Sequence, residues 1–176
     1  MTEDLEILQG AISAVVYQNY ENGYVDFEDG VITAVGDAAN APAYAGEVID
    51  AQGGYIMPGL IDAHSHIGIS EEGFRWEGED CNEMSAPITP EMRAIDGIRP
   101  EDGRLMNGIV GGVTTICTGP GSANVVGGTF VAIKLAGKRV DKMIIKDPIA
   151  MKCAFGENPK RCYGQGAKKS PTTRMA

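Results

Sequence analysis

The sequence has few of the residues from which small cross-linked domains are built. Its four cysteines form no C-x-x-C pair and are widely separated, at Cys81, Cys117, Cys153 and Cys162. A structural zinc knuckle or a disulfide framework is therefore not expected, and the thiols are predicted to be reduced. Histidine is scarcer still, with only His64 and His66 in 176 residues.

Long apolar runs and a basic N-terminal segment are also missing. No run approaches the roughly 18 apolar residues that a membrane-spanning helix needs. The start, MTEDLEILQG, carries acidic residues where a signal peptide would carry positive charge. We therefore expect a cytoplasmic protein without a membrane partner. With 43% hydrophobic and 22% charged residues, the chain can bury a core in one large domain or two small ones.

Positive charge is nearly absent from the first 100 residues. Up to residue 100 there are 3 Lys/Arg against 19 Asp/Glu, and beyond it 12 against 5; these parts carry −16 and +7, which give the net charge of −9. The basic second part could hold an anionic substrate or nucleic acid. However, its lysines alternate with apolar strand residues and lack interleaved aromatics, as in FVAIKLAGKRVDKMIIK. We therefore predict a solvated face or pairing between the two parts, and no nucleic-acid partner.

Short strands broken by turn residues are predicted up to about residue 57. The candidate strands are LEILQG, AISAVVY, YVDFEDG, VITAVGD, EVIDA and YIMP. The EDG between Phe27 and Val31 predicts a hairpin, because Asp-Gly between two strand patterns is a strong turn signal. Residues 1–57 are therefore predicted to form a small antiparallel β-unit.

From Pro58 onward, strands alternate with helical or looped segments. RPEDGRLMNGIVGG predicts a short helix that begins at Pro100 and has one apolar face, made of Leu105, Met106, Ile109 and Val110. The strand VTTICT follows directly, and the strands TFVAIKLAG and KMIIKDP come later. The order strand, helix, strand predicts a parallel α/β sheet or barrel. The irregular segment between Gly68 and Arg99 either covers an active site or is a simple surface excursion, with one short helix near Pro90 to Asp96.

His64 and His66 end the apolar run in GLIDAHSHIGI. Residues two apart on a strand project to the same face with Cα atoms roughly 6.5 Å apart, so two imidazoles there can converge on one ion. Neutral imidazole nitrogen suits zinc and similar divalent metals. The preceding residues Leu60, Ile61 and Ala63 predict a strand buried on both faces, as in a parallel barrel that keeps its chemistry at the strand ends.

Alternatives remain for these polar side chains. One histidine can be hydrogen-bonded in a core while the other faces solvent, which needs no metal. Asp62 shares the face of the pair by the same period of two. It can orient an imidazole through a hydrogen bond, or it can make a structural hydrogen bond near a turn.

The stretch GGYIMPGLIDAHSHIGI resembles the opening barrel strand of the amidohydrolase superfamily. FEDGVITAVGD and EVIDAQGGYIMPGLID resemble its N-terminal β-sandwich, and GGVTTICTGPGSANVVGG resembles its second barrel strand and the loop that follows. DPIAMKCAFGENPKRCYG is similar to imidazolonepropionase-like members. The resemblance implies an α/β fold in which residues 1–57 form a small β-sandwich part and residues 58–176 the first half of a TIM-like (β/α)8 barrel.

The same resemblance implies a metal-dependent hydrolase that cleaves amide or cyclic amide C–N bonds of a small-molecule substrate with metal-activated water. It implies a divalent metal, with zinc expected, and carries over His64 and His66 as metal ligands. The two further histidines, the late catalytic aspartate and the bridging ligand of the family have no counterpart, so no catalytic residue is assigned. Imidazolone, N-acyl amino acid and proline-containing dipeptide chemistry stay open as substrates.

Residues 58–176 fall short of the roughly 250 residues of a complete barrel. We therefore predict an inactive N-terminal fragment of a longer enzyme. An open half-barrel leaves sheet edges unpaired, so association into a homo-oligomer is expected. The alternative is a non-catalytic assembly or binding module with an amidohydrolase fold.

Overall fold

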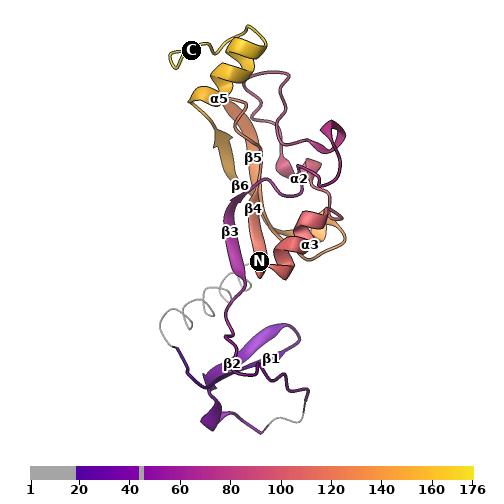
Figure 1. Ribbon diagram of the computed structural model, residues 1–176, viewed down its shortest axis with the longest axis vertical. Coiled ribbons are helices and arrows are strands. Elements are labelled where there is room, and N and C mark those ends of the chain that lie inside the picture. The colour runs from indigo at the N-terminus through magenta and orange to yellow at the C-terminus, as the bar shows by residue number, and fades with distance from the viewer. Residues whose placement is uncertain (1–18, 44–45) are drawn as a thin grey trace. The chain divides into compact units, whose positions relative to one another are not determined.

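The computed structural model describes residues 19–43 and 46–176, which fall into two compact units divided between Pro58 and Gly59 (Figure 1). The N-terminal unit has a two-stranded sheet in the order β1-β2, and the second unit has a four-stranded sheet in the order β3-β4-β5-β6. The chain is thus a mixed α/β protein, as predicted. No helix within the described ranges is long and apolar enough to cross a membrane.

A β-hairpin organises the N-terminal unit. Strand β1 (Gly23–Glu28) pairs antiparallel with β2 (Val31–Asp37). Asp29 and Gly30 form the turn between them, with φ of 52° and 81°. Positive φ at both central residues is what a type I′ hairpin turn requires, and Asp-Gly adopts it readily. The predicted hairpin is confirmed.

Two further strands predicted for this unit, at 47–51 and 55–58, are wrong. Neither segment is a strand, and between them lies a turn in which Gly54 N donates to Ala51 O over 2.8 Å. A strand needs a neighbour for its backbone groups, and the described residues offer none to either segment. The predicted strands LEILQG and AISAVVY lie outside the described residues. The 3₁₀ turn η1 (Ala38–Asn40) follows β2.

The first two strands of the second unit are parallel. Strand β3 (Leu60–Ser65) pairs with β4 (Val113–Thr118), and the chain between them contains η2 (Trp76–Gly78), α2 (Ala94–Gly97) and α3 (Gly103–Val110). A parallel pair needs such a crossover connection. The predicted strand, helix, strand order is therefore confirmed for this pair.

The remaining strands are antiparallel, which corrects the prediction of a sheet that continues in parallel. Strand β5 (Val126–Lys134) runs against β4, and β6 (Ile144–Cys153) runs against β5. Residues 119–125 and 135–143 make the two connections, and each is shorter than the dozen or so residues that a parallel crossover needs. The second connection holds only the single turn α4 (Val140–Met143).

Helix α3 begins later than predicted, at Gly103 instead of Pro100. Asp102 is its N-cap and accepts a hydrogen bond from Arg104 N over 3.1 Å, which satisfies one of the free N–H groups of the first turn. The predicted apolar face is only partly buried: Leu105 lies in the core, whereas Met106 and Val110 are exposed.

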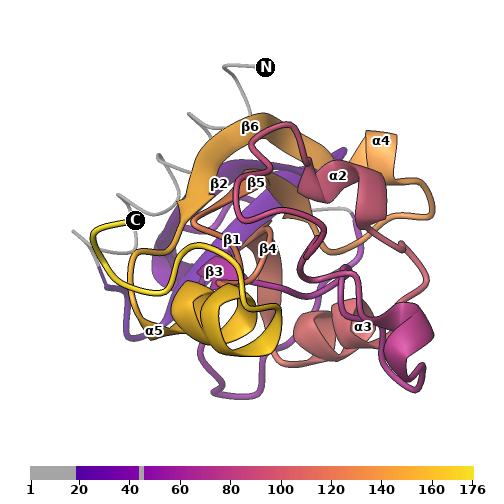
Figure 2. The same cartoon turned by 90° about the horizontal axis from the view of Figure 1, so that it is seen from above.

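One apolar core lies where α2 and α3 pack on the same side of the sheet (Figure 2). Its central side chains come from α2, α3, β4 and β5: Ile95, Leu105, Ile116, Val131 and Ile133. The chain continues beyond β6 into α5 (Glu157–Pro159) and the π-helix η3 (Lys160–Gly166). This packing holds strand β4 beside the end of β3, where both histidines lie.

Candidate metal-binding site

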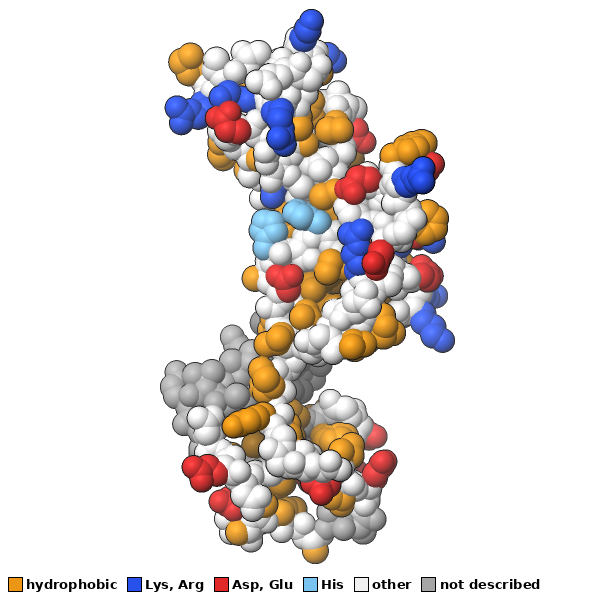
Figure 3. Space-filling model, in the orientation of Figure 1, with side chains coloured by type: hydrophobic (Ala, Val, Ile, Leu, Met, Phe, Trp, Pro, Cys, Tyr) orange, Lys and Arg blue, Asp and Glu red, His pale blue; other side chains and the backbone are white. Residues whose placement is uncertain are grey.

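The two histidines come together at the exit of β3. His64 lies in the strand and His66 directly follows its last residue. Their ring centroids are 5.3 Å apart and their planes are nearly perpendicular, at 87°. Figure 3 shows both imidazoles side by side at the surface, with His64 exposed and His66 half-buried. Of the alternative without a metal, the solvent-facing histidine is present as His64, whereas the hydrogen-bonded His66 is only half-buried and lies beside it.

A backbone carbonyl orients the ring of His66. Its Nδ1 lies 2.6 Å from the carbonyl oxygen of Gly119, in the loop after β4. A carbonyl oxygen can only accept, so Nδ1 must carry the hydrogen of this bond. In the neutral ring the other nitrogen, Nε2, is then left with a free lone pair. This is the arrangement in which an imidazole can bind a metal ion.

Buried polar groups fix the backbone just beyond β3. The hydroxyl of Thr118 donates to Ile67 O over 2.8 Å, and the Asp102 carboxylate accepts from Gly68 N over 3.3 Å. Both Thr118 and Asp102 are buried, so water does not compete for these bonds. Helix α3 and strand β4 therefore hold the segment that follows His66.

Asp62 makes the structural hydrogen bond and orients neither imidazole. Its Oδ1 accepts from the backbone N–H of His64 over 3.1 Å. This is one of the two alternatives that the sequence left open. The pKa of the nearby Cys117 thiol is raised by burial and, to a smaller extent, by the Asp62 carboxylate. Cys117 is thus a neutral neighbour on the adjacent strand.

Strand β3 is not buried on both faces, contrary to the prediction. Five of its six residues are exposed, and Ile61 keeps 49% of its surface accessible. Within the described ranges β3 has a single neighbour, β4, so its other edge and most of its side chains meet no partner. The apolar sequence expected of a barrel strand is present, but the described residues provide no layers that cover both of its faces.

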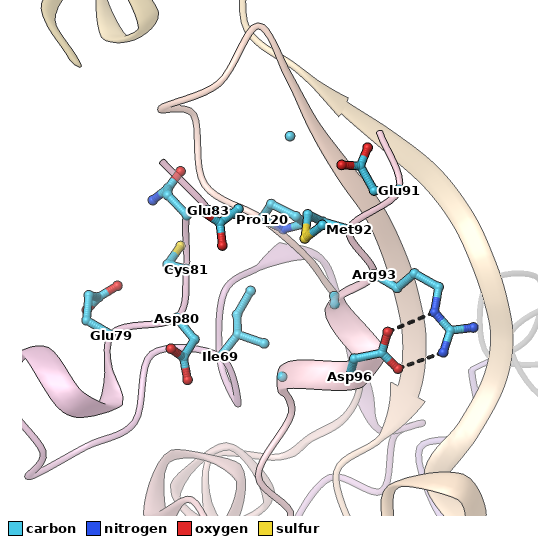
Figure 4. Close-up of a pocket in the computed structure, with 14 residues that line it drawn as sticks. Ile69, Glu79, Asp80, Cys81, Glu83, Glu91, Met92, Arg93, Asp96 and Pro120 are labelled. Carbon is cyan, nitrogen blue, oxygen red and sulfur yellow. Dashed lines mark hydrogen bonds and ion pairs between the residues drawn. The ribbon is translucent and has the colours of Figure 1, made fainter. Parts of the chain in front are cut away.

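The second unit also contains a cavity of about 310 Å³, whose lining residues are drawn in Figure 4. The segment between Gly68 and Arg99 supplies most of its lining, including the carboxylates of Glu79, Asp80 and Glu91. Asp96 also lines the cavity, and its carboxylate is paired with Arg93 over 2.6 Å. Neither histidine is among the lining residues. The irregular segment thus lines a separate cavity and does not enclose His64 and His66 in it.

The donor set fits part of a metal site. Two imidazole nitrogens suit zinc, whereas catalytic zinc sites have three protein ligands. Over residues 19–43 and 46–176, no group of three or more His, Cys, Asp or Glu side chains could hold a metal ion. Further ligands would have to come from outside these residues.

Four residues that shape the site carried no recognised signal in the sequence. They are Asp102, Thr118, Gly119 and Phe130, and each contacts the exit of β3 or the rings themselves. The only available hint was the glycine-rich segment TGPGS after β4, which contains Gly119. Its proximity to the histidines follows from the parallel pairing of β3 with β4.

Comparison with known proteins connects the chain to several hydrolases. It is 38% identical over 166 residues to the amidohydrolase tasK of Hapsidospora irregularis, which covers 87% of this chain and 17% of tasK. It is 34% identical over 99 residues to the imidazolonepropionase of Mesorhizobium japonicum, covering 54% of this chain and 21% of that protein. No family model matches the sequence.

The fold agrees with a solved relative. The crystal structure of an amidohydrolase from Thermotoga maritima MSB8 superposes with a TM-score of 0.80 at 44% identity, over 86% of this chain and 39% of that one. The chain thus spans about a fifth of the length of the curated relatives named above and about two fifths of the solved one. The chain belongs to the amidohydrolase superfamily and matches its N-terminal part.

Proposed function

We propose that this chain carries the first two metal ligands of a metal-dependent amidohydrolase that acts on C–N bonds of a small substrate. The observation that carries the proposal is the convergence of two imidazoles at the exit of β3, with His66 oriented so that Nε2 is free. A divalent ion, with zinc expected, would supply an activated water and polarise the scissile carbonyl when bound.

Each residue of the site has a separate part in this proposal. His64 and His66 bind the ion as neutral ligands and transfer no proton. The carbonyl of Gly119 holds His66 in the tautomer that keeps Nε2 unprotonated. Asp102 and Thr118 keep the backbone after His66 in place. The described residues offer neither a third ligand nor an assigned general base, so we expect no turnover by this chain alone.

The open edges of the second unit support an incomplete barrel. Strands β3 and β6 are the outer strands of the described sheet, and apolar side chains on both are exposed, among them Leu60, Ile61, Ile149 and Met151. We propose that the parallel strands β3 and β4 within residues 58–176 begin a (β/α)8 barrel, that the antiparallel strands β5 and β6 extend from them, and that the hairpin unit is part of a β-sandwich. Exposed strand edges favour association, so we expect copies of the isolated chain to associate in the cytoplasm.

The names of the relatives support a proposal for the substrate class. Their names include imidazolonepropionase, allantoinase and 5-methylthioadenosine/S-adenosylhomocysteine deaminase. From these names we propose, for the complete protein, a small nitrogen-containing substrate that is cleaved at a C–N bond.

A second candidate is a non-catalytic assembly or binding module with this fold. The observation that favours it is the two-ligand donor set, since the described residues offer no third side chain near the pair. In this alternative the imidazoles bind no metal, so the zinc content of the chain separates the two candidates.

The test is the metal content of the 176-residue chain after loading with zinc and gel filtration. The variants are the double substitution His64→Ala/His66→Ala and, as a control for thiol binding, Cys153→Ser, because Cys153 is exposed. We expect the double variant to lose the bound zinc and the control to retain it. Equal zinc in the wild type and the double variant would contradict the metal-binding function.

A further inference from the structure

We propose that Phe130 is a positioning residue for the histidine pair and holds the two imidazoles so that they can share one ion. This inference rests on the proposed metal-binding role of His64 and His66. Phe130 lies in β5, two strands away from β3, and only 5% of its surface is accessible. It is therefore a buried ring set beside two accessible ones.

The three rings contact one another. The Phe130 ring centroid is 5.4 Å from that of His64, with an interplanar angle of 74°, and 6.4 Å from that of His66, at 57°. Both distances fall within the 4.5–7 Å range of favourable aromatic pairs, and the contact with His64 is edge-to-face. An exposed histidine would otherwise sample several rotamers. The Phe130 ring favours the one that turns His64 toward His66.

Gly119 links the phenyl ring to the hydrogen bond of His66. A Cβ atom added at Gly119 would overlap the Phe130 ring, so the ring lies directly against this glycine. The Gly119 carbonyl is the acceptor for Nδ1 of His66. Phe130 therefore covers one side of the peptide that sets the tautomer of His66, and it keeps water from competing there.

The packing of Phe130 differs from that of its neighbour in β5. Val131 belongs to the apolar core formed with α2 and α3, whereas Phe130 is not a member of that core. Successive strand residues project to opposite faces. Substituting Val131 thus weakens the core without touching the histidines, and Val131→Ala is a matched control for general loss of stability.

The test measures the histidine side chains directly by ¹H–¹⁵N NMR on the metal-free chain at one alkaline pH. With only two histidines, both rings can be assigned through His64→Ala and His66→Ala spectra. In the wild type we expect His66 as the Nδ1–H tautomer and a nuclear Overhauser contact between the two rings. In Phe130→Leu and Gly119→Ala we expect a tautomer mixture and loss of that contact, with Val131→Ala unchanged.

Either of two NMR results would overturn the role of Phe130: an unchanged tautomer and ring contact in Phe130→Leu, or a tautomer mixture and loss of the ring contact in Val131→Ala. A zinc titration of the same samples adds a second readout, in which Phe130→Leu should bind about 10-fold more weakly than the wild type. Wild-type affinity in Phe130→Leu also refutes the proposal. If the wild-type rings do not respond to zinc, the proposed function fails, and the metal-free spectra still decide whether Phe130 positions them.

Discussion

His66 Nδ1 and the carbonyl oxygen of Gly119 lie 2.6 Å apart and join the exit of β3 to the loop after β4. The bond spans 53 positions in sequence. It gives the imidazole a defined tautomer before any ligand arrives, because a carbonyl can only accept. The contact thus separates two functions of one ring: Nδ1 serves the fold and Nε2 is available for chemistry.

Substitution of His66 should separate these two functions. Asparagine keeps an N–H near the position of Nδ1 but has no counterpart of Nε2, and alanine removes both. We expect His66→Asn to keep the unfolding free energy of the wild type, and His66→Ala to lose about 1 kcal/mol, the usual net value of a hydrogen bond. Both variants should lose zinc-induced stabilisation. Urea unfolding with and without zinc measures both effects, and zinc stabilisation of His66→Asn would contradict the assignment of Nε2.

Asp102→Asn should destabilise the second unit. The buried carboxylate accepts hydrogen bonds from the backbone N–H groups of Gly68, Glu72 and Arg104, over 3.3, 3.4 and 3.1 Å. An amide turns an NH₂ group toward at least one of these donors and leaves it unsatisfied, which costs about 1–3 kcal/mol. Urea unfolding measures the loss.

The matched control for that substitution is Asp96→Asn. Asp96 is paired with Arg93, but both side chains are exposed. Exposed ion pairs contribute little, so we expect no measurable change in the unfolding midpoint. Equal losses of unfolding free energy in Asp102→Asn and Asp96→Asn would contradict a role of the buried Asp102 carboxylate in holding the segment after His66.

Tyr163→Phe should lower the stability of the second unit, because the Tyr163 hydroxyl bonds η3 to other segments of that unit. The buried hydroxyl of Tyr163 lies 2.8 Å from Ala86 O and 3.0 Å from Asn124 Oδ1. Removing it takes a hydrogen-bond donor away from the half-buried Ala86 carbonyl and the buried Asn124 side chain, which costs about 1–2 kcal/mol. Differential scanning calorimetry measures the loss. Tyr55→Phe is the control, because Tyr55 is 101% exposed and should have no effect.

The buried thiol of Cys81 should cause the unfolding free energy to decrease at alkaline pH. Burial raises the pKa of its thiol above the ordinary value of 9.0, the Glu79 carboxylate raises it further, and a hydrogen bond with Ser70 partly opposes the shift. The folded state therefore keeps the proton to higher pH than the unfolded state does. The protonated Cys81 thiol contributes its full stabilisation at pH values below its pKa in the unfolded state. This contribution is lost as the pH rises through its pKa in the folded state.

Substituting this thiol should flatten the alkaline part of the stability curve. We expect Cys81→Ala to lose less unfolding free energy between pH 8 and pH 10.5 than the wild type, measured by urea unfolding under reducing conditions. Cys153→Ser, at an exposed thiol, should follow the wild-type curve. Parallel curves for all three proteins would contradict a buried thiol at Cys81.

Features that depend on neighbouring residues could be predicted from the sequence. The Asp29-Gly30 turn was predictable because its positive φ angles are accessible to Asp and Gly. Strand β4 was predictable from its β-branched residues, and the period of two in a strand placed the histidines on one face. The amidohydrolase family could likewise be identified from local motifs around His64.

Features that depend on distant partners could not be predicted in this way. The antiparallel course of β5 and β6 follows from which strand edge each one meets. The burial predicted for β3 requires neighbours that the described residues do not contain. Gly119 and Phe130 reach the histidines only because pairing of β3, β4 and β5 closes gaps of more than 50 positions. Residue types and spacings limit which groups can bind a metal, whereas backbone pairing across the sheet selects the tautomer and the orientation in which they are held.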